Sequence, residues 1–452
     1  MSQAQDYIAL DKKYVWHHLT QHKLYEKGDP IVIVEGKGNR VKDINGKDYL
    51  DCVAGGVWTV NVGYANERMV RAVADQIATL NYFANSYANL PTIRFSEKLI
   101  SHMPGLDRVY MSNSGSEANE KAFKIVRQIG QLKHGGKKTK IMFRYRDYHG
   151  TTIGCLSACG QFERKNQYGP FVPGFVEFPD CSAYRYHMEN DPDAGVKFAK
   201  KFEEVLLKED PDTVGGVIIE PITAGGGVIV PPDGYMETLD EICKKYGVLL
   251  IIDEVVCGVG RTGKWFGYQH WNVKPDMVTM AKGVASGYAP ISCTVATEQV
   301  FQDFVNDPAD RDAYFRDIST FGGCTAGPAA GYENICIIED ENLLDNVNRQ
   351  GAYLMDGLMA LKDKYEIVGD VRGKGLFAGI ELVKDRATRE PADESKAGAL
   401  CGACMKEGVI IGRTARCFRD LNNTVCFAPA LNSTKDDMDE LLAALDKGLA
   451  TL

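Results

Sequence analysis

Two charged residues stand at the ends of short apolar runs, where charged side chains are uncommon. Asp253 ends the run "VLLII", and Lys282 follows "MVTMA". A carboxylate in such surroundings needs a cation or hydrogen bonds to offset its lost hydration, so we expect Asp253 to face either a protonated ring nitrogen or an arginine such as Arg261. Most lysines are solvated surface charges. Partial burial lowers the pKa of an ammonium group, however, so the position of Lys282 favours a lysine that forms imines.

A turn rich in serine and glycine follows a predicted strand and opens a predicted helix. The stretch is "SNSGSEANEKAFKIVRQIG", and its apolar residues fall on one helical face: Ala118, Ala122, Ile125, Val126 and Ile129. Free backbone amides, the hydroxyls of Ser114 and Ser116 and the positive end of the helix dipole would suit a phosphate. A capping box between Ser114 and Glu117 accounts for the same residues, so both interpretations stay open. A phosphate cradle, an acid for a ring nitrogen and an imine-forming lysine together describe pyridoxal 5'-phosphate.

The elements that must position these residues alternate between short apolar strands and helical stretches. We predict strands within 108–114, 140–150, 214–222, 248–256 and 276–283. Strands this far apart, with helices between them, are typical of parallel pairing and of a sheet covered on both faces. Ligands of such sheets bind beyond the carboxyl ends of the strands. The polar residues at those ends are Ser114, Tyr148, Glu220, Asp253 and Lys282.

Two further parts of the chain flank this region. Residues 31–53 alternate β-rich runs with Gly and Asn-Gly turns, which predicts a small antiparallel meander. After residue 331 we expect a long amphipathic helix, then strands within 371–383 and 408–418, and a final helix capped by Ser433. The resulting division of the chain is an N-terminal segment with the meander (1–60), a large domain (61–329) and a small C-terminal domain (330–452).

Composition disfavours several classes of protein. The chain has 452 residues, of which 44% are hydrophobic and 25% charged, so it should fold as globular units. Its net charge of -9 comes from interspersed acids and bases, which leaves no electrostatic footprint for nucleic acid. No signal peptide or membrane-spanning stretch is visible, so we expect a cytoplasmic protein with no membrane partner. The 13 cysteines should be free thiols, and "CGAC" at 401–404 lacks the second ligand pair of a metal site, so no metal is expected.

Three glycines spell a dinucleotide-binding fingerprint: Gly258, Gly260 and Gly263. That fingerprint requires the first glycine directly after the strand and a helix that opens on the third. Here "DEVVC" intervenes, and "RTGKWFGYQHW" downstream is aromatic and loop-like. A nicotinamide-dependent oxidoreductase is therefore disfavoured.

A series of long motifs resembles the class III aminotransferases, the ω-aminotransferase group. The motifs, in chain order, are "GGVWTVNVGYAN", "SNSGSEANE", "YHGTTIG", "EPITAGGGVIVPP", "IIDEVVCGVGRTG" and "AKGVASGYAP". The resemblance implies an α/β protein of fold type I, with a mostly parallel seven-stranded sheet in the large domain and a smaller α+β domain built from both termini. Lys282 would then form the Schiff base with pyridoxal phosphate and shuttle a proton, and Asp253 would partner the pyridinium nitrogen.

The same resemblance implies the other cofactor contacts. Gly115 and Ser116, beside Ser114, would hold the phosphate. Tyr148, next to His149, would stack on one face of the ring, Val255 would pack on the other, and Glu220 would lie near the ring hydroxyl. Thr320 would reach the phosphate of the other subunit, so a monomer should be inactive and the protein a homodimer, or a tetramer of two dimers. Cys324-Thr325 replaces the Asn or His and then Pro that commonly follow the glycine pair, which leaves the local turn open.

Substrate contacts are implied less directly. Trp58, Phe83 and Tyr87 would wall the mouth of the site, although each could instead pack in the dimer interface. An arginine should bind the acceptor's carboxylate, with Arg413 the first choice and Arg416 the second.

The opening "DKKYVWHHLTQHK" most resembles the subgroup that transfers the amino group of taurine to pyruvate, giving L-alanine and sulfoacetaldehyde. β-Alanine or another amine as donor, or an aminomutase or decarboxylase on the same fold, remain alternatives. A non-enzymatic regulator is disfavoured because the lysine is present and no DNA-binding module is added.

Overall fold

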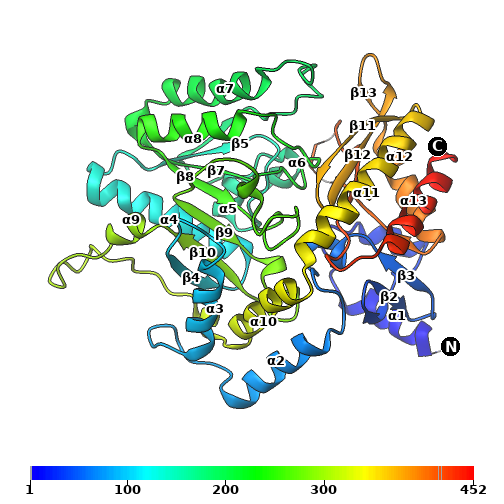
Figure 1. Ribbon diagram of the computed structural model, residues 1–452, viewed down its shortest axis with the longest axis horizontal. Coiled ribbons are helices and arrows are strands. Elements are labelled where there is room, and N and C mark those ends of the chain that lie inside the picture. Colours follow the sequence, from blue (N-terminus) through cyan, green and yellow to red (C-terminus); the bar gives the residue numbers. More distant parts are fainter. Residues whose placement is uncertain (1–2, 416, 419) are drawn as a thin grey trace.

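The computed structural model describes residues 3–415, 417–418 and 420–452 (Figure 1). Its largest sheet has seven strands. In spatial order they are β4 (Arg108–Ser112), β10 (Ser292–Ala296), β9 (Met277–Met280), β8 (Leu249–Asp253), β7 (Val214–Ile219), β5 (Lys140–Arg144) and β6 (Phe175–Phe178). The five strands predicted from the sequence are confirmed, whereas β6 and β10 were not predicted.

The sheet is mostly parallel, as expected, with one antiparallel strand, β10. Strands β6, β5, β7, β8 and β9 pair in parallel, as predicted. Strand β4, however, pairs only with β10, which runs antiparallel to both β4 and β9. Because β10 lies between them and is antiparallel to both, β4 and β9 point the same way. The residues that follow them, Ser114 and Lys282, therefore come to the same edge of the sheet.

Both faces of this sheet are covered by helices. Successive side chains of a strand point to opposite sides, so each face receives its own set of apolar residues. Ile141, Ile218 and Ile251 pack with helix α4 (Gly115–His134) on one face. Their neighbours Met142, Val217, Leu250 and Ile252 pack on the other face with α7 (Ala194–Lys208) and α8 (Tyr235–Tyr246). The five predicted apolar residues of α4 are all buried.

Two smaller sheets are built from the two ends of the chain. Strands β1 (Ile33–Lys37), β2 (Arg40–Asp43) and β3 (Asp48–Asp51) form the predicted antiparallel meander, and β14 (Val409–Ile410) joins it in parallel with β3. The other sheet contains β11 (Val368–Lys374), β12 (Phe377–Asp385), β16 (Thr424–Phe427) and β15 (Gly412–Arg413), with β13 (Glu390–Pro391) beside β12. Figure 1 shows both sheets beside the large one, with the two termini on the same side of the molecule.

Helices complete the structure. The C-terminal half carries α10 (Ala326–Asp340), α11 (Leu343–Lys364), α12 (Glu394–Lys406) and α13 (Lys435–Leu449). The N-cap of α13 is Thr434, which forms a capping box with Asp437, so the prediction of Ser433 was one residue early. The remaining α-helices are α1 (Gln3–Tyr14), α2 (Glu67–Thr79), α3 (Leu90–Ile100), α5 (Ile153–Ser157), α6 (Phe162–Lys165) and α9 (Glu298–Gln302). Single turns of helix are η1 (His22–Glu26), η2 (Ala54–Trp58), η3 (Pro211–Thr213), η4 (Gly267–His270), η5 (Lys282–Val284) and η6 (Thr320–Gly323).

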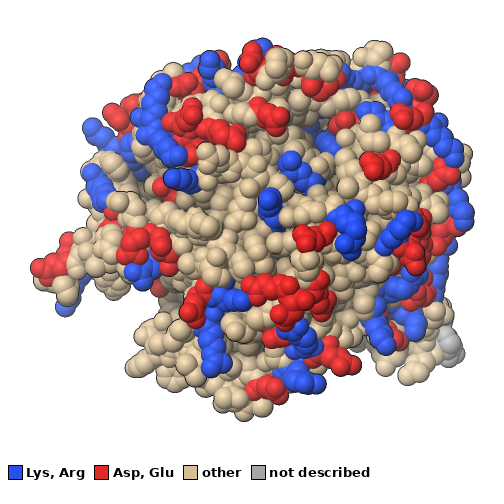
Figure 2. All heavy atoms as spheres, viewed as in Figure 1, with Lys and Arg blue, Asp and Glu red and all other residues tan. Residues whose placement is uncertain are grey.

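The surface has charges of both signs. Figure 2 shows Lys and Arg interspersed with Asp and Glu over the viewed face. Within the described part of the chain, no helix is both long and apolar enough to cross a membrane. The 13 cysteines, all of which are described, are free thiols.

Candidate active site

Lys282 begins the short turn η5 directly beyond the end of β9. Its φ of 43° lies in the left-handed region, which costs energy for a residue with a side chain and is found where the surrounding structure enforces it. Part of that enforcement comes from Asn334, whose Nδ2 donates to the carbonyl oxygens of Gly283 and Val284 at 2.9 and 3.1 Å. The strained turn fixes the direction in which the lysine leaves the sheet.

The ammonium of Lys282 has no hydrogen bond or ion pair with any described residue. Its Nζ lies 5.3 Å from the centre of the Trp58 ring. Burial lowers the pKa of Lys282, although the neighbouring carboxyl groups of Glu220 and Asp253 oppose that change. A half-buried lysine with a lowered pKa and no fixed partner can lose its proton and act as a nucleophile or base.

Asp253, the last residue of β8, is buried and receives three hydrogen bonds. Its Oδ2 accepts from Asn119 Nδ2 and His149 Nδ1, both at 2.8 Å, and its Oδ1 accepts from the amide of Val255 at 3.0 Å. These donors hold the carboxylate in one orientation. Arg261 is not the partner of Asp253, because its guanidinium donates to Asn61 Oδ1 at 2.7 Å and to the carbonyls of Leu376 and Pro429.

Glu220 and Tyr148 lie beside this pair, beyond β7 and β5. The two oxygens of Glu220 accept from the amides of Tyr148 and Ala224 at 2.9 and 3.0 Å. Burial, with Asp147 and Asp253 nearby, raises the pKa of Glu220 well above its ordinary value. Burial also raises the pKa of the Tyr148 phenol to about 12, so the ring stays neutral at working pH. A neutral, half-buried aromatic ring is suited to stacking.

The start of α4 meets the same region. Ser114 caps the helix in a capping box with Glu117, so the capping interpretation of its hydroxyl is confirmed. The amides of Gly115 and Ser116 belong to the first turn and have no acceptor among the described residues. A Cβ added to Gly115 would lie 3.1 Å from Val255 Cγ2 and 3.7 Å from the Cβ of Ala281, the neighbour of Lys282. Two free amides and the positive end of the helix dipole therefore lie near Ala281 and Val255, an arrangement that suits an anion.

His149 and Trp58 each keep one polar atom buried without a hydrogen-bond partner: Nε2 of His149 and Nε1 of Trp58. The Trp58 ring contacts Phe377 edge to face at 5.8 Å between centres. With Nδ1 donating to Asp253, Nε2 of a neutral His149 ring is an acceptor, whereas Trp58 Nε1 is a donor. Buried polar atoms without partners are costly, and both atoms are available to a group that is not part of the protein chain. Trp58 and Lys282 are brought together, as the sequence predicted for a residue at the mouth of the site.

Phe83, Tyr87 and Thr320 are not brought to Lys282 by this chain. Phe83 and Tyr87 are exposed and contact each other at 5.1 Å between ring centres. Thr320 is exposed at the start of η6, and the amide of Phe83 donates to Gly323 O at 3.2 Å, which joins the two segments. No hydrogen bond or ring contact links these three residues to Lys282 within the described chain.

The turn after η6, which the sequence left open, ends in helix α10. Cys324 forms an isolated antiparallel bridge with Tyr82. Thr325 is the N-cap residue of α10, and its hydroxyl donates to Leu80 O. The hydroxyl of Thr325 thus ties the turn to the segment before Phe83. The turn is held in place without a proline at this position.

The first-choice substrate arginine points elsewhere in this structure. Arg413 Nη1 pairs with Glu394 Oε1 of α12 at 2.9 Å. Its guanidinium lies against Gly398 of the same helix, where an added Cβ would be 3.8 Å from Arg413 Cζ. Arg416, the second choice, lies outside the described residues.

The dinucleotide interpretation of Gly258, Gly260 and Gly263 is wrong. Residues after β8 form turns, and the next helical element is the single turn η4, so no helix opens on Gly263. A Cβ at Gly260 would lie 2.8 Å from Leu431, and one at Gly263 would lie 2.0 Å from Asn348 Oδ1. These glycines allow close packing against C-terminal elements.

Two residues of the site were missed. Asn119 bridges Asp253 to the carbonyl of His149 and also accepts from Thr279 Oγ1 at 2.6 Å, which links α4, β8 and β9. Its signal was a polar residue within the apolar face of the helix, next to Ala118. Arg164 places its guanidinium 5.4 Å from the centre of the Tyr148 ring, and no sequence pattern marked it.

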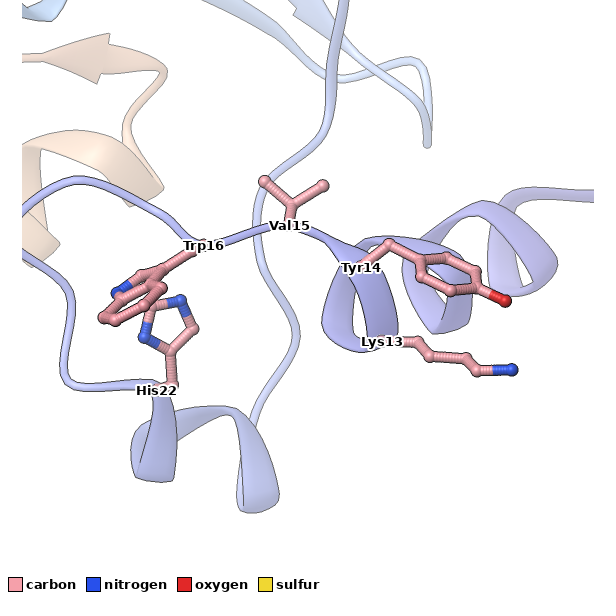
Figure 3. A pocket seen from close by; sticks show the side chains of 5 residues that line it. All are labelled: Lys13, Tyr14, Val15, Trp16 and His22. Atoms are coloured by element: carbon pink, nitrogen blue, oxygen red, sulfur yellow. The ribbon is translucent and has the colours of Figure 1, made fainter.

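A hollow of about 280 Å³ at the N-terminal segment contains none of these residues. It is lined by Lys13, Tyr14, Val15, Trp16 and His22. Figure 3 shows Trp16 and His22 next to each other, with Lys13 and Tyr14 pointing away from them. Trp16 is 90% exposed, so this is an open surface feature and not the candidate active site.

Comparison with known proteins defines the class. The family model for class-III aminotransferases matches residues 24–449, and the chain belongs to that family. It is 68% identical over 445 residues to a taurine–pyruvate aminotransferase of Bilophila wadsworthia, covering 98% of this chain and 97% of the relative. It is 56% identical to a hypotaurine/taurine–pyruvate aminotransferase of Paracoccus denitrificans, covering 98% and 96% of the two chains. A crystal structure of a Bacillus anthracis aminotransferase superposes with a TM-score of 0.96 at 38% identity, covering 100% of this chain and 99% of the other.

Proposed function

We propose that this aminotransferase moves the amino group of taurine to pyruvate and yields sulfoacetaldehyde and L-alanine. The main structural support for aminotransferase chemistry is that unpaired Lys282, buried Asp253 and the free amides of α4 lie at one edge of the large sheet. The substrates are inferred from the relatives that are 68% and 56% identical over nearly the whole chain.

The residues present fit pyridoxal 5'-phosphate. Gly115 and Ser116 would hold its phosphate, Tyr148 and Val255 would enclose its ring, and His149 with Nε2 unpartnered lies beside Asp253. When bound, this cofactor supplies an aldehyde that condenses with amines and a protonated ring that withdraws electrons from the adjacent carbon. Asp253 would face the ring nitrogen, and Glu220 would lie near the ring hydroxyl.

Each protein group then has a distinct task. Asp253, fixed by Asn119 and His149, would present a negative charge that keeps the ring nitrogen protonated. Lys282 would hold the cofactor's aldehyde carbon between turnovers, and once released its Nζ would accept and return the proton of the substrate carbon. Its lowered pKa helps this role, because a neutral amine is needed to accept that proton.

We further propose that the enzyme is a cytoplasmic homodimer, with Thr320 reaching the phosphate in the partner's site. Exposed apolar side chains support an interface near Thr320: Phe83, Tyr87, Ile318 and Phe321 are 48%, 66%, 79% and 67% exposed. Large exposed apolar groups of this kind usually mark an interaction surface. The free thiols fit a reducing compartment.

Replacement of the lysine tests the chemistry. We expect Lys282→Ala to abolish alanine formation from taurine and pyruvate, while Lys274→Ala, an exposed lysine nearby, retains it. Undiminished transamination by Lys282→Ala would refute the assignment.

A donor panel of taurine, β-alanine and 1-phenylethylamine with pyruvate tests the substrate. We expect taurine to give the highest kcat/KM. No activity on taurine would discard the substrate assignment, and no alanine with any of the three donors would favour an aminomutase or decarboxylase.

A further inference from the structure

Arg164 is a partly buried arginine with few of its donors in use. It lies on α6, and its guanidinium sits over the Tyr148 ring, 5.4 Å from the ring centre. Its Nη2 makes one long hydrogen bond, 3.4 Å, to the carbonyl of Ala415, and its Nε is buried without a partner. A guanidinium carries five N–H donors, so most of those of Arg164 are free to bind another group.

Three other enclosed arginines of the chain are neutralised by a carboxylate. Arg144 pairs with Asp147 at 3.0 Å, Arg372 with Asp370 at 2.7 Å and Arg413 with Glu394 at 2.9 Å. No carboxylate among the described residues pairs with Arg164. Arg146 and Arg261 also lack one, but they are only 2% and 0% exposed and donate to backbone carbonyls, whereas Arg164 is half-buried.

Arg164 lies on the ring of Tyr148, one of the residues at the strand ends around Lys282. Its positive charge contributes to the lowering of the Lys282 pKa, after the larger effect of burial, and it also opposes the raised pKa of Tyr148. An unneutralised cation beside the candidate nucleophile repels the protonated amine and attracts an anion. Taurine and pyruvate each carry a permanent anionic group within a few bonds of the reacting carbon.

The short helix α6 is held in place by other contacts. The amide of Glu163 donates to Cys417 O at 3.1 Å, and Asn422 Nδ2 donates to both Glu163 Oε2 and Glu394 Oε2 at 3.1 and 3.2 Å. Glu394 is also the partner of Arg413. One network thus fixes the backbone that carries Arg164 and occupies Arg413.

We propose that Arg164 binds the anionic group of the substrates, the sulfonate of the donor and the carboxylate of the acceptor, and so selects small amines with an acidic terminus. The planar guanidinium fork matches two oxygens of either group. This inference rests on the proposed function, because it names the residue that recognises its substrates.

The test compares Arg164→Gln, Arg164→Lys and the control Arg349→Gln, an exposed arginine of α11, as purified holoenzymes; Arg413→Gln is measured beside them as the competing arginine. Donor half-reactions with taurine and with propylamine, which has no anionic group, separate anion recognition from chemistry. We expect Arg164→Gln to lower kcat/KM for taurine about 30- to 100-fold and for propylamine less than about threefold, since a charged hydrogen bond is lost only with taurine. Arg164→Lys, which keeps the charge but not the fork, should fall in between, and Arg349→Gln should stay within about threefold of wild type.

A binding measurement keeps the test independent of turnover. Ethanesulfonate, which lacks the amine, should bind the wild-type holoenzyme in a calorimeter and bind Arg164→Gln at least about 30-fold more weakly. Equal ethanesulfonate affinity in the two proteins, or a selective loss of taurine turnover in Arg413→Gln or Arg416→Gln instead, would overturn the role of Arg164. Wild-type enzyme that binds ethanesulfonate through Arg164 but does not convert taurine would refute the proposed function and leave the anion site standing.

Discussion

Replacement of Asp253 by asparagine removes the charge at the ring nitrogen with almost no change of shape. Asp253 has three donors to satisfy, from Asn119, His149 and Val255. An asparagine has one oxygen and one NH₂ group. With its oxygen toward Asn119 and His149, its NH₂ faces the amide of Val255; in the reverse orientation it faces the other two donors. One buried donor therefore loses its acceptor, which costs about 1–3 kcal/mol of the free energy of unfolding.

The effect on catalysis is larger than the effect on stability. Breaking a buried charged pair by removing one partner costs about 3–5 kcal/mol. At about 1.36 kcal/mol per factor of ten, kcat/KM for taurine should fall about 10²- to 10⁴-fold in Asp253→Asn. The assay is alanine formed from taurine and pyruvate, measured on protein whose fold and bound cofactor are checked by near-ultraviolet circular dichroism.

Glu254 supplies a matched control one residue away. It is equally buried, but its oxygens accept from the amides of Gly267 and Tyr268 at 2.9 and 2.7 Å and not from the site. Burial raises the pKa of Glu254 to about 8, so the group is mostly neutral at pH 7. In Glu254→Gln the NH₂ group faces one of the two amides, so this variant also leaves one buried donor without its acceptor and matches the stability cost of Asp253→Asn. We expect Glu254→Gln to keep kcat/KM within about threefold of wild type, since the charge at the ring is unchanged. If Asp253→Asn stays within tenfold of the wild type, Asp253 does not act on the ring nitrogen.

Two further predictions concern stability. Burial, aided by Lys374, lowers the pKa of His270 to about 4, so between about pH 6.5 and 4 the unfolded chain binds a proton that the folded chain does not. The stability from neutral His270 is present above pH 6.5 and lost toward pH 4. After allowance for partial exposure of the ring, His270→Gln should reduce this loss in the free energy of urea unfolding by about 1–2 kcal/mol. Parallel plots of unfolding free energy against pH for the two proteins would contradict this. Ser114→Ala should cost about 1 kcal/mol in urea unfolding of both apoenzyme and holoenzyme, because the cap is lost in each, whereas a loss confined to the holoenzyme would mean that this hydroxyl holds the phosphate.

The large sheet could be predicted because its central strands are continuous apolar runs between helices. Strands β5, β7, β8 and β9 are buried on both faces, so their pattern does not depend on knowing the neighbours. β6 has four residues, only one of them buried, which is too weak a signal. The position of β4 depends on the reversal at β10, and pairing across such a distance leaves no trace in local periodicity.

The site residues that could be predicted from the sequence are those at the ends of strands. Tyr148, Glu220, Asp253 and Lys282 follow apolar runs, and the structure brings these four residues together. Asn119 and Arg164 act from helices, where most polar side chains simply face solvent and a functional one has no distinct pattern. Residues exposed on this chain, such as Phe83 and Thr320, depend on a second subunit, so their roles stay predictions, as do the domain boundaries after residues 60 and 329.

Reduction of the holoenzyme with borohydride tests the central claim most directly, because it makes the bond between lysine and cofactor permanent. Mass spectrometry of the digested protein should then find the reduced pyridoxyl group on the peptide that contains Lys282, and on no peptide when the enzyme is first converted to its amine form with taurine. A pyridoxyl group on a different lysine, or none on the untreated holoenzyme, would contradict the account.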